Sequence, residues 1–278
     1  MSELTSNRRR AWLRFVRNRS AWVGMLIVGI LLVAAIGADW LAPYRANEQV
    51  SQFARPSWQH WLGTDVDQHD VFSRVIHGTR LSLVAGAISI AVAVLIGVPC
   101  GALAGFWGGR IDSLLMRAID IALAFPSILL ALLIATAVSR GWLAVIVAVG
   151  LINVPMFARQ VRATVLGMRG LEYVLASRAL GASTWHILWR VILPGLSGPI
   201  VVLATLGLGS AILEVAGLSF LGVGGDPTDA EWGAMLAQSK DFLSRSVWPA
   251  IGPGAAISLA ILGFNLLGDG LRDAIEPR

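Results

Sequence analysis

The amino-acid sequence predicts an all-α polytopic membrane protein with six transmembrane helices and both termini in the cytoplasm. Of its 278 residues, 56% are hydrophobic and only 14% are charged, whereas a soluble domain carries about 25% charged residues. The mean hydropathy is +0.70. Charge-free stretches of roughly 20 residues, the length that a helix needs to cross the hydrocarbon core, recur along the chain. Because a backbone in lipid must satisfy its own hydrogen bonds, these stretches are predicted to be helices.

The composition also excludes other classes of protein. The sole cysteine, Cys100, lies inside an apolar run, so no disulfide scaffold can form. The net charge of +5 does not indicate nucleic-acid binding, because the basic residues flank apolar segments and do not gather in one patch. The basic excess is instead typical of membrane topology.

Six charge-poor stretches define the predicted spans. They cover residues 20–38, 81–109, 121–139, 141–158, 191–225 and 246–268. The chain divides accordingly into a basic cytoplasmic segment at 1–21, a first transmembrane helix at 22–42, an extracytoplasmic loop at 43–79, a five-helix membrane domain at 80–271 and a cytoplasmic tail at 272–278.

The distribution of basic residues sets the orientation of these spans. Six arginines precede the first span, and six crossings return the C-terminus to the same side. Fifteen of the 22 basic residues then lie on that side, which makes it cytoplasmic. The first apolar run is longer than the about 7–15 residues of a signal-peptide core, so we prefer an uncleaved span to a cleaved signal peptide. The sequence therefore predicts a multi-pass protein of the cytoplasmic (inner) membrane.

The longest cytoplasmic connection, at residues 162–194, is predicted to contain two short helices with a hinge between them. Residues 172–180 suit a helix, Gly181 can take the left-handed conformation that ends it, and Ser183 can cap the next one. Pro194 is expected to end the segment before the fifth span. The side chains expected to be exposed are Leu175, Leu180, Trp185, Ile187, Arg178 and Arg190. Rigid helices of this kind let a partner push on the membrane bundle; an amphipathic linker resting on the headgroups is the alternative.

The spacing of this segment resembles the coupling motif of binding-protein-dependent ABC importer permeases. That motif reads Glu-Ala-Ala, three residues, Gly, nine residues, Ile, any residue, Leu-Pro, and this chain has Leu175-Ala176-Ser177, Gly181, Val191, Leu193 and Pro194 at those positions. Leucine replaces the leading glutamate, serine the second alanine and valine the isoleucine. The resemblance implies coupling helices at 172–194 that contact an ATPase subunit. The residues implied are Glu172, Leu175, Ala176, Ser177, Arg178, Gly181, Ala182, Ser183, Trp185, His186, Leu193 and Pro194.

Further motifs along nearly the whole chain are similar to the C-type permease of the dipeptide, oligopeptide and nickel group. They are Trp-Leu-Gly-Thr-Asp at 61–65, Arg-Ala-Ile-Asp at 117–120, Ala-Phe-Pro-Ser at 124–127, Leu-Ser-Phe-Leu-Gly at 218–222, Glu-Trp-Gly-Ala-Met-Leu at 231–236 and Phe-Asn-Leu-Leu-Gly-Asp-Gly-Leu-Arg-Asp at 264–273. One departure lies in the first outer loop, where the group has Gly-Arg-Asp and this chain has Gln68-His69-Asp70.

The resemblance implies the type I ABC importer permease fold and a permease subunit that moves di- or oligopeptides across the cytoplasmic membrane. The implied partners are a second permease subunit in a heterodimer, two ABC ATPase subunits, an extracytoplasmic substrate-binding protein and membrane lipid, with no nucleic acid. An importer of nickel or a metal chelate is the near alternative. An ATP-independent channel or secondary transporter is the remote one.

The chain itself is not expected to be an enzyme. A Walker loop needs the pattern G-x-x-x-x-G-K-[ST], and the sole lysine, Lys240, stands between Ser239 and Asp241. ATP and Mg²⁺ are therefore expected on the ATPase partners, with no catalytic residue and no cofactor on this chain.

No metal site is expected either. The first outer loop holds His60, His69, His77, Asp65, Asp67 and Asp70. Their nitrogen and oxygen ligands would suit nickel or zinc, which is the alternative. Their spacing fits no standard site, so we expect a solvated loop.

Four polar residues in or near the spans are singled out. Arg117 and Asp120 stand three residues apart and are expected to form a structural ion pair; a pathway role is the alternative. Glu214 lies deep in the fifth span, where an isolated carboxylate is costly. It is expected either to line the substrate route and meet a cationic group or to hydrogen-bond a neighbouring helix. Asn265, near the inner end of the sixth span, is the second pathway candidate, and holding helix ends together is its alternative role.

Overall fold

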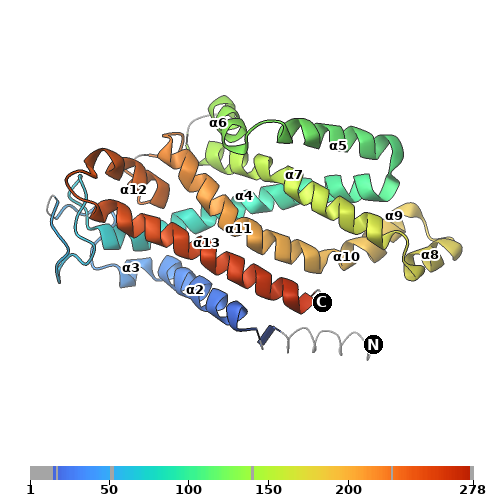
Figure 1. Ribbon diagram of the computed structural model, residues 1–278, viewed down its shortest axis with the longest axis horizontal. Helices are drawn as coiled ribbons and strands as arrows, with labels where there is room; N and C mark the ends of the chain where they lie inside the picture. The colour runs from blue at the N-terminus through green and yellow to red at the C-terminus, as the bar shows by residue number, and fades with distance from the viewer. Residues whose placement is uncertain (1–14, 17, 51–52, 139–140, 227, 276–278) are drawn as a thin grey trace.

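Helices make up almost all of the protein. The structure, a computed structural model, describes residues 15–16, 18–50, 53–138, 141–226 and 228–275 (Figure 1). Within these ranges there is no β-strand beyond two isolated bridges. The α-helices are α2 (Arg19–Ile36), α3 (Ala38–Leu41), α4 (Val71–Trp107), α5 (Gly109–Leu123), α6 (Ser127–Val138), α7 (Trp142–Met168), α8 (Glu172–Ala179), α9 (Thr184–Ile187), α10 (Leu193–Gly195), α11 (Ser197–Phe220), α12 (Trp232–Ser239) and α13 (Trp248–Ile275). A π-helix at Leu188–Ile192 and a 3₁₀-helix at Lys240–Phe242 complete the order.

Five helices, α2, α4, α7, α11 and α13, are long and apolar enough to cross a membrane. Helices α5 and α6 pass the same test only as a pair, and they are bent by 96° at their junction. The predicted count of six spans therefore holds when this bent pair crosses as one. The stretch at 121–139 is not the single helix that was predicted, because Pro126 interrupts it and α6 begins at Ser127. Proline lacks an amide donor and disfavours the helical conformation of the residue before it. The carbonyl of Pro126 accepts from the amides of Leu129 and Leu130 at the start of the new helix.

Four predicted boundaries differ from the helix ends that the structure shows. Helix α2 begins at Arg19, where the side chain of Asn18 caps it, and breaks at Gly37. Helix α4 begins at Val71 and not at residue 80, because the carboxylate of Asp70 accepts the amide of Ser73 at 2.8 Å and starts the helix there. The outer loop accordingly ends at Asp70. At the other end of the chain, α13 continues to Ile275, past residue 271.

Glycines bring the central helices α4 and α7 into close contact. Gly97, Gly101 and Gly105 repeat every four residues along one face of α4. A Cβ atom at Gly97 would lie 2.7 Å from the Cβ of Phe157, and one at Gly105 would lie 2.8 Å from the carbonyl oxygen of Arg162. Small residues at this spacing let membrane helices pack backbone to backbone. The largest buried apolar cluster is built around this pair of helices.

Different connecting segments lie at the two ends of the molecule. In Figure 1, α12 and the loop before α4 gather at one end, and α8 and α9 gather at the other. The amide nitrogen of Asn18 donates to Asp273 at 3.0 Å, so the start of α2 lies beside the end of α13. Ile275 in turn lies next to Gly198, at the start of α11. Both described ends of the chain therefore meet on the side of α8 and α9, as the predicted topology requires.

One exposed residue of the outer loop has an unfavourable backbone conformation. Gln68 adopts φ +72°, which costs a residue with a side chain roughly 1–2 kcal/mol relative to glycine. We expect Gln68→Gly to raise the free energy of unfolding by about 1 kcal/mol, since the entropy of the unfolded glycine offsets part of the gain. The measurement is the melting temperature of the detergent-purified protein. Gln49→Gly, at an exposed position without positive φ, should lower it; equal shifts in the two variants would contradict the argument.

Candidate functional site

The first half of the coupling segment, which we define as residues 172–194, has the local structure that its sequence predicts. Helix α8 runs from Glu172 to Ala179, and Gly181 follows in the left-handed conformation with φ +80°. The hydroxyl of Ser183 accepts the amide of His186 at 3.3 Å and caps α9. A glycine hinge therefore separates two helices with different directions.

The second half of the segment differs from the prediction, because Pro194 does not end it. Helix α9 passes into the π-helix, then into α10 and α11, with a single turn residue, Leu196, between the last two. Pro194 lies in the first turn of α10, where its fixed φ is compatible with a helix. The coupling segment is thus joined to α11 by an almost continuous helix.

Buried side chains fix the coupling segment to the ends of α4 and α7. Val174, Ile187 and Leu188 are buried in the same apolar cluster as Phe106 and Val165. The predicted exposure of Ile187 is wrong, since the fourth residue of α9 faces the bundle. At the edge of the cluster the guanidinium of Arg178 lies 5.7 Å from the ring centre of Phe106.

The opposite face of the coupling segment is exposed. Leu180 is 89% exposed, and Leu175 and Trp185 are about half exposed. The indole of Trp185 also makes an edge contact with that of Trp107 at 5.1 Å, which ties the exposed face to the end of α4. The other exposed members of the predicted set are Glu172, Ala176, Arg178, Gly181, Ser183, His186 and Pro194; Ser177, Ala182 and Leu193 are partly exposed. A rigid, mixed apolar and basic surface therefore projects from this end of the molecule.

The predicted ion pair between Arg117 and Asp120 is wrong. Asp120 instead accepts from Arg159 of α7 at 2.5 Å, and Asp112 pairs with Arg162 at 2.5 Å. Helix α5 lies beside α7. The carboxylates of α5 therefore pair with arginines of α7, and Asp120 does not pair with Arg117 of its own helix. These two pairs fasten α5 to α7.

The structure places the two pathway candidates on different helices without a contact between them in the described residues. Glu214 is half-buried on α11 and accepts the side-chain amide of Asn153 of α7 at 2.6 Å. That amide also donates to the carbonyl of Val149 at 2.9 Å. Asn265 is exposed on α13 and lies beside Gly209 of α11. The hydrogen bond of Glu214 to a neighbouring helix was one of the two predicted roles, and it leaves the second carboxylate oxygen available.

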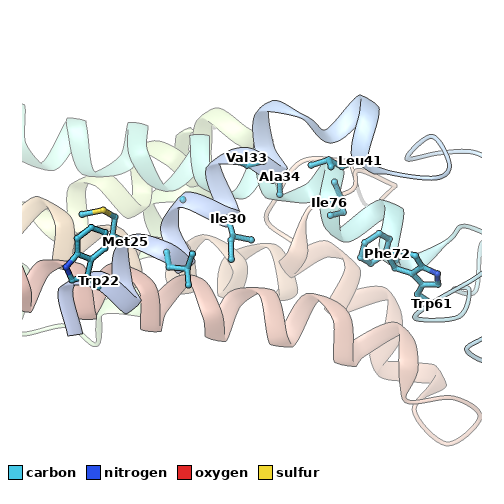
Figure 2. A pocket seen from close by; sticks show the side chains of 11 residues that line it. Trp22, Met25, Ile30, Val33, Ala34, Leu41, Trp61, Phe72 and Ile76 are labelled. Atoms are coloured by element: carbon cyan, nitrogen blue, oxygen red, sulfur yellow. The ribbon is translucent and has the colours of Figure 1, made fainter. Parts of the chain in front are cut away.

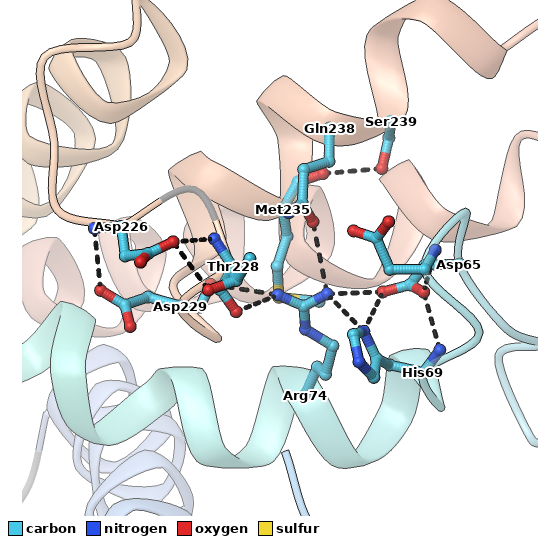
Figure 3. A network of polar contacts seen from close by, with 10 residues as sticks. Asp65, His69, Arg74, Asp226, Thr228, Asp229, Met235, Gln238 and Ser239 are labelled. Carbon is cyan, nitrogen blue, oxygen red and sulfur yellow. Dashed lines mark hydrogen bonds and ion pairs between the residues drawn. The ribbon is translucent and has the colours of Figure 1, made fainter. Parts of the chain in front are cut away.

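A buried arginine joins the two outer loops, and sequence reasoning missed it. The side chain of Arg74 is fully buried. It donates to Asp65 at 2.6 Å and to the carbonyls of Thr228 and Asp229 at 2.9 and 3.2 Å (Figure 3). A guanidinium offers five donors in a planar fork, which suits it to several acceptors at once. We call Asp65, His69, Arg74 and the two carbonyls the outer polar cluster.

His60 and His69 of the first outer loop are buried in the folded outer end, so the predicted solvated loop is wrong there, whereas His77 lies on α4. His60, His69 and Asp70 are buried. The Nδ1 atom of His69 lies 3.1 Å from the guanidinium of Arg74 and 3.5 Å from a carboxylate oxygen of Asp65. In the described part of the chain no three His, Cys, Asp or Glu side chains are grouped to hold a metal ion. The loop is built by hydrogen bonds that its sequence spacing does not disclose.

A second buried acidic residue positions α12 at the outer end. The carboxylate of Glu231 accepts the amides of Gly233 and Ala234 at 2.9 and 2.8 Å and thereby caps the helix. Burial raises the pKa of Glu231 above its ordinary value. The indole of Trp232, fully buried, donates to the carbonyl of Val75 at 3.1 Å. Helix α12 is therefore fixed against α4, and together with the outer polar cluster it forms a rigid outer platform.

This arrangement defines a class of protein: a polytopic helical membrane protein with a projecting surface at one end and a folded platform at the other. Residues 97–278 match the family described as "Binding-protein-dependent transport system inner membrane component", and residues 6–57 match "N-terminal TM domain of oligopeptide transport permease C". The chain belongs to this family. It is a multi-pass permease subunit of an ABC importer in the inner membrane, and not an enzyme.

Individual relatives agree with this assignment. The chain is 40% identical over 272 residues to the dipeptide transport system permease protein DppC of Alkalihalophilus pseudofirmus, covering 97% of this chain and 90% of the relative. It is 43% identical over 274 residues to the glutathione transport system permease protein GsiD of Pectobacterium atrosepticum, covering 97% and 91%. The di/tripeptide transport system permease protein DppC of Pseudomonas aeruginosa is 40% identical over 275 residues, with coverage of 96% and 91%.

A solved structure confirms the predicted fold. A chain of the MetNI methionine ABC transporter, in an inward-facing conformation, aligns with a TM-score of 0.60 at 22% sequence identity. The alignment covers 72% of this chain and 96% of that chain. At this identity the likeness concerns the fold alone.

The outer polar cluster makes a clear stability prediction. Arg74→Met leaves the buried carboxylate of Asp65 without its cation, so we expect unfolding to become about 3–5 kcal/mol easier. Arg80→Met, six residues along the same helix, removes a half-exposed pair with Asp39 and hydrogen bonds to the carbonyls of Ala35 and Ile36. Because Arg80 is half-exposed and leaves no buried charge behind, this change should cost clearly less than Arg74→Met. Thermal unfolding of the purified protein and protease sensitivity of the outer loops measure both. Similar losses in the two variants would show that Arg74 does not hold the platform together.

Proposed function

We propose that the chain is the C-type permease subunit of an ATP-driven importer for di- and oligopeptides. The observation that carries the proposal is that relatives 40–43% identical over nearly the full length of both chains are named for dipeptide, di/tripeptide and glutathione transport. The match of residues 6–57 to an oligopeptide permease C domain supports the same assignment.

The proposed assembly contains a second, similar permease subunit, two ATPase subunits and an extracytoplasmic binding protein. The sole lysine, Lys240, lies at the outer end in a 3₁₀-helix after α12 and not in a phosphate-binding loop, which favours separate ATPase subunits. The exposed face of the coupling segment is the surface offered to them. The outer platform is the surface offered to the binding protein.

Buried contacts and a nearly continuous helix connect the coupling segment to the membrane spans, so that a displacement of its exposed face would reach them. Its exposed face includes Leu180 and Trp185, and its buried face is packed on the ends of α4 and α7. A displacement applied to α9 passes along the π-helix and α10 into α11, which carries Glu214. We infer that closure of the ATPase subunits moves α11 relative to α7 and opens the path outward, and that ATP hydrolysis resets it.

The hinge glycine provides the first test of this mechanism. Gly181→Ala places a Cβ atom at φ +80°, where the backbone cost is about 1 kcal/mol or more. We expect α8 to reorient against α9 and ATP-dependent peptide uptake in proteoliposomes to fall several-fold. Gly170→Ala is the matched control, because Gly170 has an equally open environment without positive φ. Equal uptake by the two variants would contradict a coupling role for the hinge.

Glu214 provides the second test. Gln can still accept the amide of Asn153, so Glu214→Gln removes the charge while the helix contact remains. If the carboxylate meets the cationic amino terminus of the peptide, uptake should show a raised KM for labelled dipeptide with normal assembly. Asn153→Ala keeps the charge and removes the contact. A transport defect in Asn153→Ala with none in Glu214→Gln would assign Glu214 a structural role only.

The cargo is tested in cells that lack the chain. Restored uptake of a labelled dipeptide or of glutathione, with no effect on nickel, is expected. Nickel uptake alone would favour the metal-importer alternative, and transport that persists with disabled ATPase subunits would favour an ATP-independent channel.

A further inference from the structure

A small pocket lies at the outer end of the molecule, between the end of α11 and α12. Its volume is about 310 Å³, at the lower end of the range of about 300–1,000 Å³ that small-molecule sites occupy. The turn after α11 is rich in glycine and α12 contributes alanines, so small side chains leave this space open. We call it the outer pocket; it is lined by residues 219–222 and 224–225, by Ala234, Ala237 and Gln238 of α12, and by Lys240 and Asp241 after that helix.

The lining of the outer pocket carries two opposite charges. Lys240, the sole lysine of the sequence, and Asp241 both line the pocket, and both are exposed. The ammonium of Lys240 lies 5.6 Å from the ring centre of Phe220, which also lines the pocket. In the described part of the chain neither Lys240 nor Asp241 forms an ion pair. Both charges are therefore open to a ligand.

The apolar groove beside α2 (Figure 2) is larger but lacks such groups. Its volume is about 730 Å³, and no charged residue lines it. A charged solute would lose its hydration in that groove without gaining a partner for its charge, which is costly. The outer pocket is therefore the better site for a small charged solute.

The outer polar cluster holds one wall of the outer pocket in place. The side-chain carbonyl of Gln238 accepts from the guanidinium of Arg74 at 3.3 Å (Figure 3). Arg74 is itself fully buried and bound to Asp65. Lys240 directly follows α12, whose start is capped by Glu231. The charged residues of the pocket therefore extend from a fixed support, and a preformed site loses less entropy on binding than one that must become ordered.

The outer pocket lies at the outer end of the face of α11 that carries Glu214. Leu221, the residue directly after α11, is half exposed and lines the pocket. It follows Glu214 by seven residues, which is about two helical turns, so the two residues lie on nearly the same side about 10.5 Å apart along the helix axis. Glu214 is therefore the next charged group inward from the pocket on this side of α11.

We propose that the outer pocket binds the cargo peptide as a zwitterion, with its terminal carboxylate on Lys240 and its terminal ammonium on Asp241, before the peptide reaches Glu214. The inference rests on the proposed function and adds a site of entry to it. The charged ends of an extended dipeptide are roughly 7 Å apart, at about 3.5 Å per residue. Because Lys240 and Asp241 are consecutive, one short peptide can contact both. A single charged side chain of a partner protein would engage only one of them.

Concentration-dependent uptake of a labelled dipeptide by the intact importer in proteoliposomes, with its binding protein, tests the proposal. Loss of one charge-assisted hydrogen bond predicts that Lys240→Ala raises KM roughly tenfold, and Asp241→Asn should raise it as well. Lys240→Arg keeps the positive charge and should restore most of the affinity.

Arg245→Ala is the matched control. Arg245 is also an exposed outer cation beside a phenylalanine, 5.9 Å from the ring centre of Phe242, but it does not line the outer pocket. Its loss should leave KM unchanged. An unchanged KM in Lys240→Ala, or an equal rise in Arg245→Ala, overturns the proposal.

A photo-cross-linking residue at Leu221 of the importer separates the cargo from protein partners. During transport we expect adducts with the labelled dipeptide, fewer of them when Lys240→Ala is added and as many when Arg245→Ala is added. Adducts with the binding protein in place of the dipeptide refute the proposal. If the wild type takes up no peptide, the proposed function fails; normal uptake by the wild type without dipeptide adducts overturns the outer pocket alone.

Discussion

The close approach of α4 to α7 is the constraint on which the rest of the structure depends. Lipid tails are as apolar as leucine, so membrane helices gain little from burying apolar surface and depend on tight packing instead. Gly97, Gly101 and Gly105 provide that packing along one face of α4. Because the two helices meet along so much of their length, Phe106 and Val165 come together at the inner end and form the surface on which the coupling segment sits.

Arginines fix both ends of this central pair. At the outer end Arg74 binds acceptors from two loops. At the inner end the guanidinium of Arg169 donates to the carbonyl of Gly105 at 3.3 Å, near the last turn of α4. Arg162 nearby holds Asp112 of α5. Helix α4 therefore runs from the outer platform to the apolar cluster that supports the coupling segment, with arginine contacts at both ends.

What the sequence predicted correctly follows from local chemistry. A charge-free run must be a helix in lipid, and Gly181 and Ser183 favour a helix end and a helix start wherever they stand. The interactions that the sequence did not predict depend on which helices are neighbours in the fold. The spacing of Arg117 and Asp120 could not reveal that Arg159 of another helix is nearer to Asp120. Arg74 and His69 are buried because α4 begins early, directly after its N-cap residue Asp70. Asp70 stands in a polar stretch of the sequence, so composition alone does not mark it as a helix cap.

The π-helix at Leu188–Ile192 completes the path from the exposed surface to the membrane interior. The amide of Leu193 bonds to the carbonyl of Leu188, five residues back, so this turn is wider than an α-helical one. Such turns are rare, appear mostly as single turns inside α-helices, and are frequent at functional sites. Here the wide turn lies between a coupling helix anchored to α4 by Trp185 and a span that carries Glu214. Because this wide turn stands between α9 and α11, the exposed surface of the coupling segment is joined to the membrane interior by one almost continuous helical path.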